Sequence, residues 1–123
     1  MNVLLVFLGG GIGAVARYGL SGVMHRWLGI GFPYGTFGVN VLGSLCIGLL
    51  MSVFEERFLV NSSLRTFLTI GLLGGFTTFS AFSYETIALM KDAQLLTASL
   101  NVLVTVFSCL LATYAGTVLG KLV

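Results

Sequence analysis

The sequence predicts an all-α membrane protein with four transmembrane helices per chain, and two observations lead to this fold class. The 123 residues are 57% hydrophobic and 8% charged, whereas soluble domains are about 45–50% apolar and about 25% charged. The charged residues also leave four long uncharged stretches, and roughly 20 apolar residues are enough for a helix to span a bilayer. We therefore expect one domain over residues 1–123, with spans at 2–23, 34–54, 65–89 and 95–120.

The composition excludes several other classes of protein. Six basic and four acidic side chains are too few to cover the surface of an ordinary soluble enzyme or to keep a chain disordered. The chain has 17 glycines but a single proline, which excludes collagen. Its one histidine and two cysteines are too few for a Cys/His zinc module or a disulfide scaffold. A net charge of +2 gives no reason to expect nucleic acid as a partner. We therefore expect a small membrane protein that is not an enzyme.

Glycines are concentrated in the first span, where two motifs suggest other interpretations. Ala14-Val15-Ala16 resembles a signal-peptide cleavage site, but no Lys or Arg precedes it and three spans follow. The residues 11–16 match the dinucleotide motif G-x-G-x-x-A, but no βαβ pattern follows them. We therefore expect glycine pairs spaced by four residues to let helices pack closely. These pairs are Gly9/Gly13, Gly71/Gly75 and Gly116/Gly120.

Four spans place both termini on one membrane face, and the positive charges are shared equally between the two faces. The terminal face carries Arg57, Arg65 and Lys121, and the opposite face carries Arg17, Arg26 and Lys91. An excess of Lys and Arg on one face normally fixes the orientation of a membrane protein, and this excess is absent. Copies could therefore insert both ways up and pair as an antiparallel dual-topology homodimer. The alternatives are a monomer and a fixed orientation set by a partner or by the N-terminal amine. Four short helices with few polar side chains make a poor transport path alone, which favours the oligomer.

The third span, between Gly71 and Thr86, has the most unusual sequence. Adjacent glycines at 74 and 75 and paired threonines at 77 and 78 weaken a helix there, since each glycine costs about 1 kcal/mol relative to alanine. We therefore expect a broken third helix, with the break within residues 74–78. Unwound backbone at membrane depth needs protein, water or an ion to satisfy its carbonyls, so carbonyls facing each other across a dimer could hold a cation. The alternative is a packing glycine pair, with the hydroxyls bonding back to the helix.

Two phenylalanines follow the expected break. Phe79 and Phe82 are three residues apart and share a helix face, as do Ser80 and Ser83. The edge of a phenyl ring carries partial positive charge, so two inward edges could contact an anion without offering it a counter-charge. In a generic membrane helix, both rings would instead fill the core or face lipid.

Uncharged hydrogen-bond donors mark the second and fourth spans. Asn40 is the only side-chain amide of the second span, and its N–H groups could bridge helices or contact a passing anion. Four polar residues of the fourth span recur every four positions, with a serine beside them: Asn101, Thr105, Cys109, Thr113 and Ser108. Such a stripe suits a partly dehydrated anion, or it supplies hydrogen bonds between helices. Because Cys46 and Cys109 lie inside spans, we expect small buried thiols rather than a disulfide.

Besides Arg65, which begins the third span, two charged residues lie within the spans. Arg17 interrupts the first span, where its side chain could snorkel to the interface or raise the local anion concentration at a pore mouth. Glu85 lies toward the end of the third span, where we expect it to pair with Arg17, Arg26 or Lys91 or to bond to nearby hydroxyls. A role for Glu85 in proton coupling is the alternative.

These motifs together resemble one known family. Gly-Gly-x-Thr-Thr-Phe-Ser-x-Phe-Ser at residues 74–83, followed by Glu85-Thr86, is similar to the signature of the Fluc (CrcB) fluoride channels. Gly-Thr-x-x-x-Asn at residues 35–40 and the glycine-rich first span leading into Arg17-Tyr18 are also similar. The resemblance covers nearly the whole chain. It implies a passive channel that exports fluoride across the bacterial inner membrane and relieves its toxicity, built as a dual-topology homodimer with two pores.

The resemblance also implies roles for individual residues. Ring edges of Phe79 and Phe82 would contact fluoride, Arg17 would act in the vestibule, and backbone carbonyls of Gly74 and Thr77 from both subunits would hold a structural Na⁺. The expected pore or fluoride-binding set is Asn40, Phe79, Phe82, Ser80, Ser83, Thr105, Ser108, Cys109 and Thr113. The chain departs from the family at Ala81, where threonine is common, and at Asn101 and Cys109, where hydroxyls are common.

Two other functions stay open at this point. A small multidrug exporter also has four short spans, but proton exchange requires an acidic residue deep in the membrane, usually in the first span, which has none. A non-transporting assembly subunit would account for the glycines but not for the donors beside paired phenylalanines. An uncharged lining, by contrast, replaces the hydration of an anion without trapping it on a fixed cation.

Overall fold

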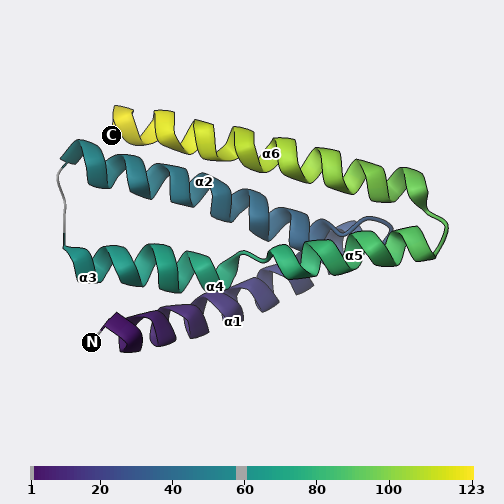
Figure 1. The fold of residues 1–123 in the computed structure, drawn as a ribbon, viewed down its shortest axis with the longest axis horizontal. Coiled ribbons are helices and arrows are strands. Elements are labelled where there is room, and N and C mark those ends of the chain that lie inside the picture. The colour runs from purple at the N-terminus through teal and green to yellow at the C-terminus, as the bar shows by residue number, and fades with distance from the viewer. Residues whose placement is uncertain (1, 58–60) are drawn as a thin grey trace.

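The computed structural model describes residues 2–57 and 61–123, which form four antiparallel helical segments (Figure 1). The first two segments are α1 (Asn2–Leu28) and α2 (Tyr34–Arg57), and the last is α6 (Leu95–Leu122). The third segment consists of α3 (Ser62–Arg65), the π-helix η1 (Thr66–Leu73), α4 (Gly74–Phe76) and α5 (Phe79–Lys91). Both termini lie at the same end of the bundle, as an even number of spans requires (Figure 1).

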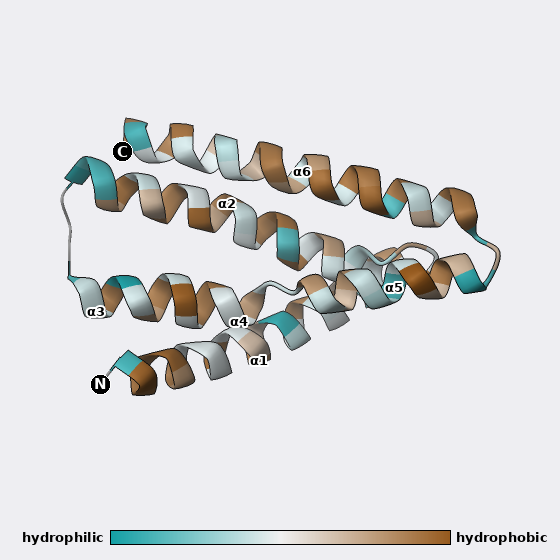
Figure 2. Ribbon diagram, in the orientation of Figure 1, coloured by the Kyte–Doolittle hydropathy of each residue, from teal (hydrophilic) through white to brown (hydrophobic). Residues whose placement is uncertain are grey.

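All four segments are long and apolar enough to cross a membrane, which confirms the predicted multi-pass helical fold. The helices are longer than the expected spans. Helix α1 continues to Leu28 rather than ending at residue 23, and α2 continues to Arg57 rather than ending at residue 54. Hydropathy marks where a chain leaves the apolar layer, whereas backbone hydrogen bonding continues the helix into the polar interface. Hydrophobic residues accordingly follow the length of each segment, and hydrophilic ones gather toward several of the helix ends (Figure 2).

Glycines allow α1 to pack directly on the backbone of the third segment. A Cβ built on Gly9 would lie 2.8 Å from the carbonyl oxygen of Phe67, and one on Gly13 would lie 2.8 Å from the amide nitrogen of Phe76. A Cβ on Gly75 would likewise overlap the backbone of Gly10. The expected role of these glycines in close helix packing is therefore confirmed.

Helices α2 and α6 also pack closely at glycines, and side-chain hydrogen bonds join them as well. Gly116 of α6 leaves no room for a Cβ against the backbone of α2, and a Cβ on Gly120 would lie 2.5 Å from that of Ser52. The hydroxyl of Ser52 donates to the carbonyl oxygen of Thr117 at 2.9 Å, and that of Thr113 donates to the carbonyl oxygen of Ser44 at 3.1 Å. These bonds fix α6 against α2 along their length.

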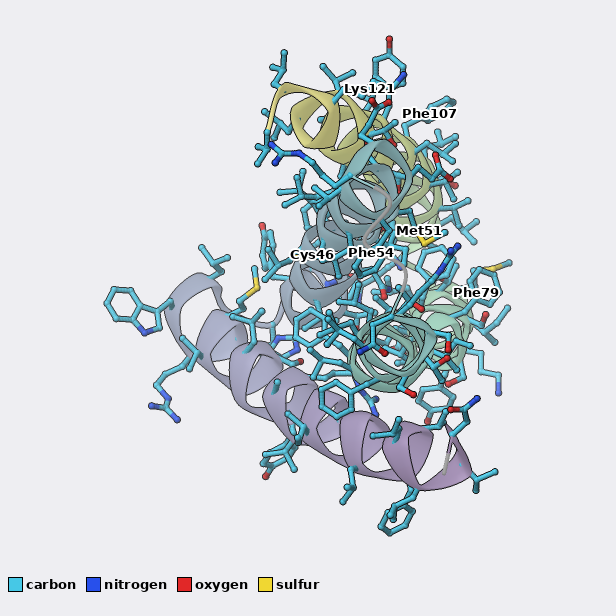
Figure 3. All side chains as sticks on the ribbon, turned by 90° about the vertical axis from the view of Figure 1, so that its left-hand side faces the viewer. Cys46, Met51, Phe54, Phe79, Phe107 and Lys121 are labelled. Carbon is cyan, nitrogen blue, oxygen red and sulfur yellow. The ribbon has the colours of Figure 1, made fainter. Side chains whose placement is uncertain are left out.

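Large apolar side chains lie on the outside of the bundle as well as in its core. Val39 and Phe76 are buried between segments, whereas Phe7 of α1 and Phe107 of α6 are 74% and 61% exposed. Figure 3 shows Phe107 and Phe79 on the outer side of the helices. An apolar surface of this extent suits lipid or another protein chain rather than water.

Candidate functional site

Two residues leave the helical conformation in the middle of the third segment. Thr77 has φ −87° and ψ 157°, and Thr78 has φ −150° and ψ 117°. The amide of Thr77 makes the last bond of the preceding helix, to the carbonyl oxygen of Leu73 at 3.0 Å. The hydroxyl of Thr78 then caps α5 by accepting from the amide of Ala81 at 3.2 Å. Backbone groups that a continuous helix would satisfy are therefore released at this point.

Side chains from α1 and α2 satisfy several of these released groups. Asn40 Nδ2 donates to the carbonyl oxygen of Thr78 at 3.0 Å, and the amide of Thr78 donates to Asn40 Oδ1 at 2.8 Å. Arg17 Nε donates to the carbonyl oxygen of Gly75 at 3.1 Å. Because the amide of Thr78 bonds to Asn40, it does not supply the i→i−4 bond that the carbonyl of Gly74 would receive in a helix.

A cavity of about 440 Å³ lies beside Thr77 and Thr78, and we call it the lateral cavity. Three segments line it. Their lining residues are Asn40, Gly43, Ser44 and Ile47 from α2, Thr69, Leu73, Gly74, Thr77, Thr78, Phe79 and Phe82 from the third segment, and Thr105, Val106, Cys109 and Leu110 from α6. Among these residues, all in the described part of the chain, none is Asp, Glu, Lys, Arg or His. The lateral cavity is therefore an apolar chamber with uncharged polar groups.

Seven of the residues singled out in the sequence meet in the lateral cavity: Asn40, Gly74, Thr77, Phe79, Phe82, Thr105 and Cys109. Five others lie outside its lining. Ser80 is exposed, with its hydroxyl 3.3 Å from that of Thr78, and Ser83 and Ser108 are half-buried. Thr113 bonds to α2, and Arg17 lines a second pocket. Cys46 and Cys109 are free and half-buried, less enclosed than the buried thiols expected from the sequence.

The paired phenylalanines are adjacent but differ sharply in burial. Their ring centroids lie 5.4 Å apart with an interplanar angle of 50°. Phe82 is 7% exposed, whereas Phe79 is 76% exposed and projects from the bundle (Figure 3). The protomer itself therefore holds the ring of Phe82, while the ring of Phe79 is open to lipid or to another chain.

A buried hydrogen-bond network behind Phe82 connects α5 to α6. Asn101 is 1% exposed, and its Nδ2 donates to Thr86 Oγ1 at 2.9 Å. The Thr86 hydroxyl donates to the carbonyl oxygen of Phe82 at 2.8 Å, and the Thr105 hydroxyl donates to Asn101 Oδ1 at 3.1 Å. Within the fourth-span stripe, the hydroxyl protons of Thr105 and Thr113 are thus both donated to protein acceptors.

Two polar residues of the lateral cavity, Ser44 and Thr69, were not predicted from the sequence. Ser44 follows Asn40 by one helical turn, so the i, i+4 spacing was a usable signal. Thr69 precedes Thr77 by eight residues, and its hydroxyl donates to the carbonyl oxygen of Arg65 at 2.8 Å. Its place in the cavity depends on how the π-helix turns the third segment, which residue spacing does not reveal.

A second hollow of about 580 Å³, which we call the end pocket, is also lined by Thr78. Its lining comes mostly from the C-terminal half of α1, with residues of α2 and α5. The full set is Ala14, Arg17, Tyr18, Gly19, Ser21, Gly22, His25, Arg26, Thr36, Val39, Thr78, Ala81 and Glu85. Thr78 lines both hollows, so both reach the interruption of the third segment. Oε1 of Glu85 is buried and makes no hydrogen bond within residues 2–57 and 61–123, although Arg17 and Arg26 line the same pocket.

Known proteins resemble the chain over nearly its whole length. Residues 4–117 match the family model described as "CrcB-like protein, Camphor Resistance (CrcB)". A Geotalea uraniireducens protein named "Fluoride-specific ion channel FluC" is 50% identical over 120 residues, which cover 98% of this chain and 97% of that protein. Proteins of the same name from Magnetococcus marinus and Coxiella burnetii are 49% identical over 123 residues and 48% identical over 122 residues, covering 100% and 98% of both chains. The chain belongs to the CrcB family.

Proposed function

We propose that the chain is a fluoride-selective passive channel, which exports fluoride across the cell membrane and relieves its toxicity. The relatives named as fluoride-specific channels match it from end to end. The observation that carries the proposal is the lateral cavity, an uncharged chamber at the interruption of a membrane-spanning segment. Neither alternative, a proton-coupled exporter or an assembly subunit, is favoured by the relatives.

The lateral cavity supports this function because it offers hydrogen-bond donors without a fixed charge. A bare anion in a low-dielectric medium loses on the order of tens of kcal/mol of hydration energy, so the route must supply substitute donors. Asn40 Nδ2 carries two hydrogens, and one of them is used on Thr78. The second hydrogen, the Cys109 thiol and the edge of the Phe82 ring are then the groups that contact fluoride. Contacts of this strength let the ion leave again, which conduction requires.

We further propose that the working unit is an antiparallel dual-topology homodimer with two pores. Phe79 and Gly74 are exposed although both line the lateral cavity, so a second copy is needed to close this side from lipid. The equal positive charge at the two ends of the bundle supports insertion both ways up. In this arrangement, Phe79 of each copy contacts the neighbouring protomer and completes a pore.

The same interruption fits a structural Na⁺ between the two copies, held by the carbonyls of Gly74 and Thr77 from each protomer. Carbonyl oxygens are the hard ligands that a small cation prefers. The Gly74 carbonyl has lost its helical partner, because the amide of Thr78 bonds to Asn40. When bound, Na⁺ would neutralise these carbonyls and add positive potential near the anion route. We expect dimers to dissociate more readily when Na⁺ is replaced by a large organic cation, and an unchanged dimer fraction would contradict this cation site.

Efflux of fluoride from liposomes that contain the purified protein tests the proposed function. The vesicles are loaded with potassium fluoride, and valinomycin lets potassium follow the anion. We expect fluoride, measured with a selective electrode, to leave far faster than from protein-free vesicles. Reporters fused to the C-terminus test the topology, since a dual-topology protein gives signal on both sides of the membrane. Signal on one side only would contradict the antiparallel dimer, whatever the efflux shows.

A further inference from the structure

Arg17 of α1 contacts the interrupted third segment through a hydrogen bond between distant parts of the sequence. Its Nε donates to the carbonyl oxygen of Gly75 at 3.1 Å, although the two residues are 58 positions apart. Close packing allows this contact, because a Cβ on Gly13, one turn before Arg17, would lie 2.8 Å from the amide nitrogen of Phe76. The half-buried side chain of Arg17 therefore lies against the last helical turn before the interruption.

Side chains bind two of the carbonyls that the interruption releases. In a continuous helix, each carbonyl oxygen accepts from the amide four residues later. The carbonyl of Gly75 accepts from Arg17 instead, and that of Thr78 accepts from Asn40. A hydrogen bond from a guanidinium is charge-assisted, which makes it roughly twice as strong as a bond between neutral groups. The oxygen of Gly75 is therefore held firmly by α1.

Two other carbonyls lose their helical donors at the same point. The amide that would serve the carbonyl of Gly74 belongs to Thr78 and donates to Asn40 instead. The amide that would serve the carbonyl of Thr77 belongs to Ala81 and donates to the hydroxyl of Thr78. The side-chain bonds thus leave without a helical donor the same two carbonyls that are proposed above to hold Na⁺.

We propose that Arg17 is a positioning residue that makes this cation site prefer Na⁺ over K⁺. The proposal rests on the site formed by Gly74 and Thr77 in the proposed dimer. Gly75 directly follows Gly74, and its bond to Arg17 withholds its oxygen from the cation. Selectivity among cations depends on the number of coordinating carbonyls or on how closely they fit the ion, and a mobile third carbonyl changes both. Without the bond to Arg17, the site gains ligands and flexibility, which favours the larger K⁺.

Two substitutions separate the hydrogen bond of Arg17 from its charge. Glutamine carries its Nε2 at the same position along the side chain as the Nε of arginine, so Arg17→Gln retains a donor without the charge. Arg17→Met has a side chain of the same reach with neither donor nor charge. Because the charge of Arg17 opposes a nearby cation, Arg17→Gln should bind Na⁺ and K⁺ both more tightly and keep the preference for Na⁺. Arg17→Met should lose this preference.

The experiment measures the dimer fraction of the purified protein in detergent as Na⁺ or K⁺ replaces a large organic cation. The ratio of the K⁺ to the Na⁺ concentration that gives half of the maximal dimer fraction measures the preference. Loss of a bond to a charged group changes an equilibrium by about tenfold or more, so the ratio should fall about tenfold in Arg17→Met and stay within about twofold of the wild type in Arg17→Gln. Arg26→Met is the matched control, because it removes another positive charge of the end pocket and should leave the ratio unchanged.

The outcomes distinguish the role of Arg17 from the cation site and from the channel function. A wild-type ratio in Arg17→Met, or a fall of the same size in Arg26→Met, would overturn the role of Arg17 and leave the cation site standing. Should Arg17→Met fail to fold, Arg17→Gln provides the test, because loss of the preference in a variant that keeps the donor would contradict the proposal. If the wild-type dimer does not respond to the cation, the cation site is wrong and the role of Arg17 is wrong with it. Fluoride efflux from liposomes tests the channel function independently of all these results.

Discussion

Asn40 and Thr78 exchange two hydrogen bonds, with the side-chain amide of Asn40 donating at 3.0 Å and accepting at 2.8 Å from the backbone of Thr78. The amide thus satisfies both backbone groups of a residue that has left the helix. One N–H of Asn40 is left over, on a residue that lines the lateral cavity. A single side chain therefore holds the interruption in place and, in the proposed channel, offers a donor to fluoride.

The first prediction concerns Asn40→Ala. This change leaves the amide and carbonyl of Thr78 without their partners, and it should destabilise the protein by about 1–3 kcal/mol and abolish most of the fluoride flux. Thermal unfolding in detergent and liposome efflux measure the two effects. Ser44→Ala is the matched control, because Ser44 lines the same cavity but only its backbone carbonyl takes part in the bond to Thr113. Wild-type stability and flux in Asn40→Ala would contradict the role of this pair.

The second prediction separates the two phenylalanines. Phe82→Ile removes a buried ring, so it should lower the free energy of unfolding by about 1–2 kcal/mol. It should also reduce the fluoride flux. Phe79→Ile alters a ring that the protomer leaves 76% exposed, so it should reduce flux while changing the stability of the protomer by less than about 0.5 kcal/mol. Phe7→Ile, at another exposed ring, controls for the loss of aromatic surface. Unchanged flux in Phe79→Ile would refute the proposal that this ring completes a pore.

The third prediction tests the glycine packing of α1. A Cβ at Gly13 meets the backbone of Leu72 and Phe76, whereas a Cβ at Gly11 meets nothing within 4 Å. Gly13→Ala should therefore destabilise the fold by about 1–3 kcal/mol through overpacking. Gly11→Ala lies in the same helix and should be neutral or slightly stabilising, because alanine favours helix. Equal melting temperatures for the two variants would show that α1 does not pack as described.

The fourth prediction concerns the network behind Phe82. Asn101→Leu removes the buried acceptor of the Thr105 hydroxyl and the amide that donates to the Thr86 hydroxyl. We expect it to destabilise the protein more than Ser99→Ala on the exposed side of the same helix. A double-mutant cycle of Asn101→Leu with Thr86→Val measures the bond itself. The coupling energy should be about 0.6–1.7 kcal/mol, the range found for hydrogen bonds between membrane helices. Additive effects would mean that Asn101 and Thr86 act independently.

The four spans could be predicted from the sequence, because an apolar stretch of about 20 residues without charges is typical of a transmembrane helix. It also identified the glycine pairs, since small residues four positions apart face a neighbouring helix. The helix ends were less accurate, as α1 runs five residues beyond its expected end at 23. Side chains such as His25 and Arg26 lower the hydropathy there without interrupting the backbone hydrogen bonds.

Hydrogen-bond partners that lie far apart in the sequence could not be predicted from residue spacing, because spacing relates only residues of the same helix. Asn40 was singled out as a donor, but its bonds to Thr78 join residues 38 positions apart. Arg17 was assigned to the interface or to a pore mouth, yet its Nε bonds to the backbone of Gly75, 58 positions away. Glu85 was expected to pair with a basic side chain or a hydroxyl, yet its Oε1 is buried and has no hydrogen-bond partner among residues 2–57 and 61–123.

The most direct test of the central claim compares fluoride with chloride in vesicles that carry the same potassium gradient, with valinomycin and without a proton gradient. An uncharged route of weak donors that replaces the hydration of a small anion should release fluoride rapidly down its gradient and retain chloride. The matched variant Phe82→Ile should lose the fluoride flux while remaining incorporated in the vesicles. Fluoride release no faster than from protein-free vesicles, or release that depends on a proton gradient, would contradict a passive fluoride channel.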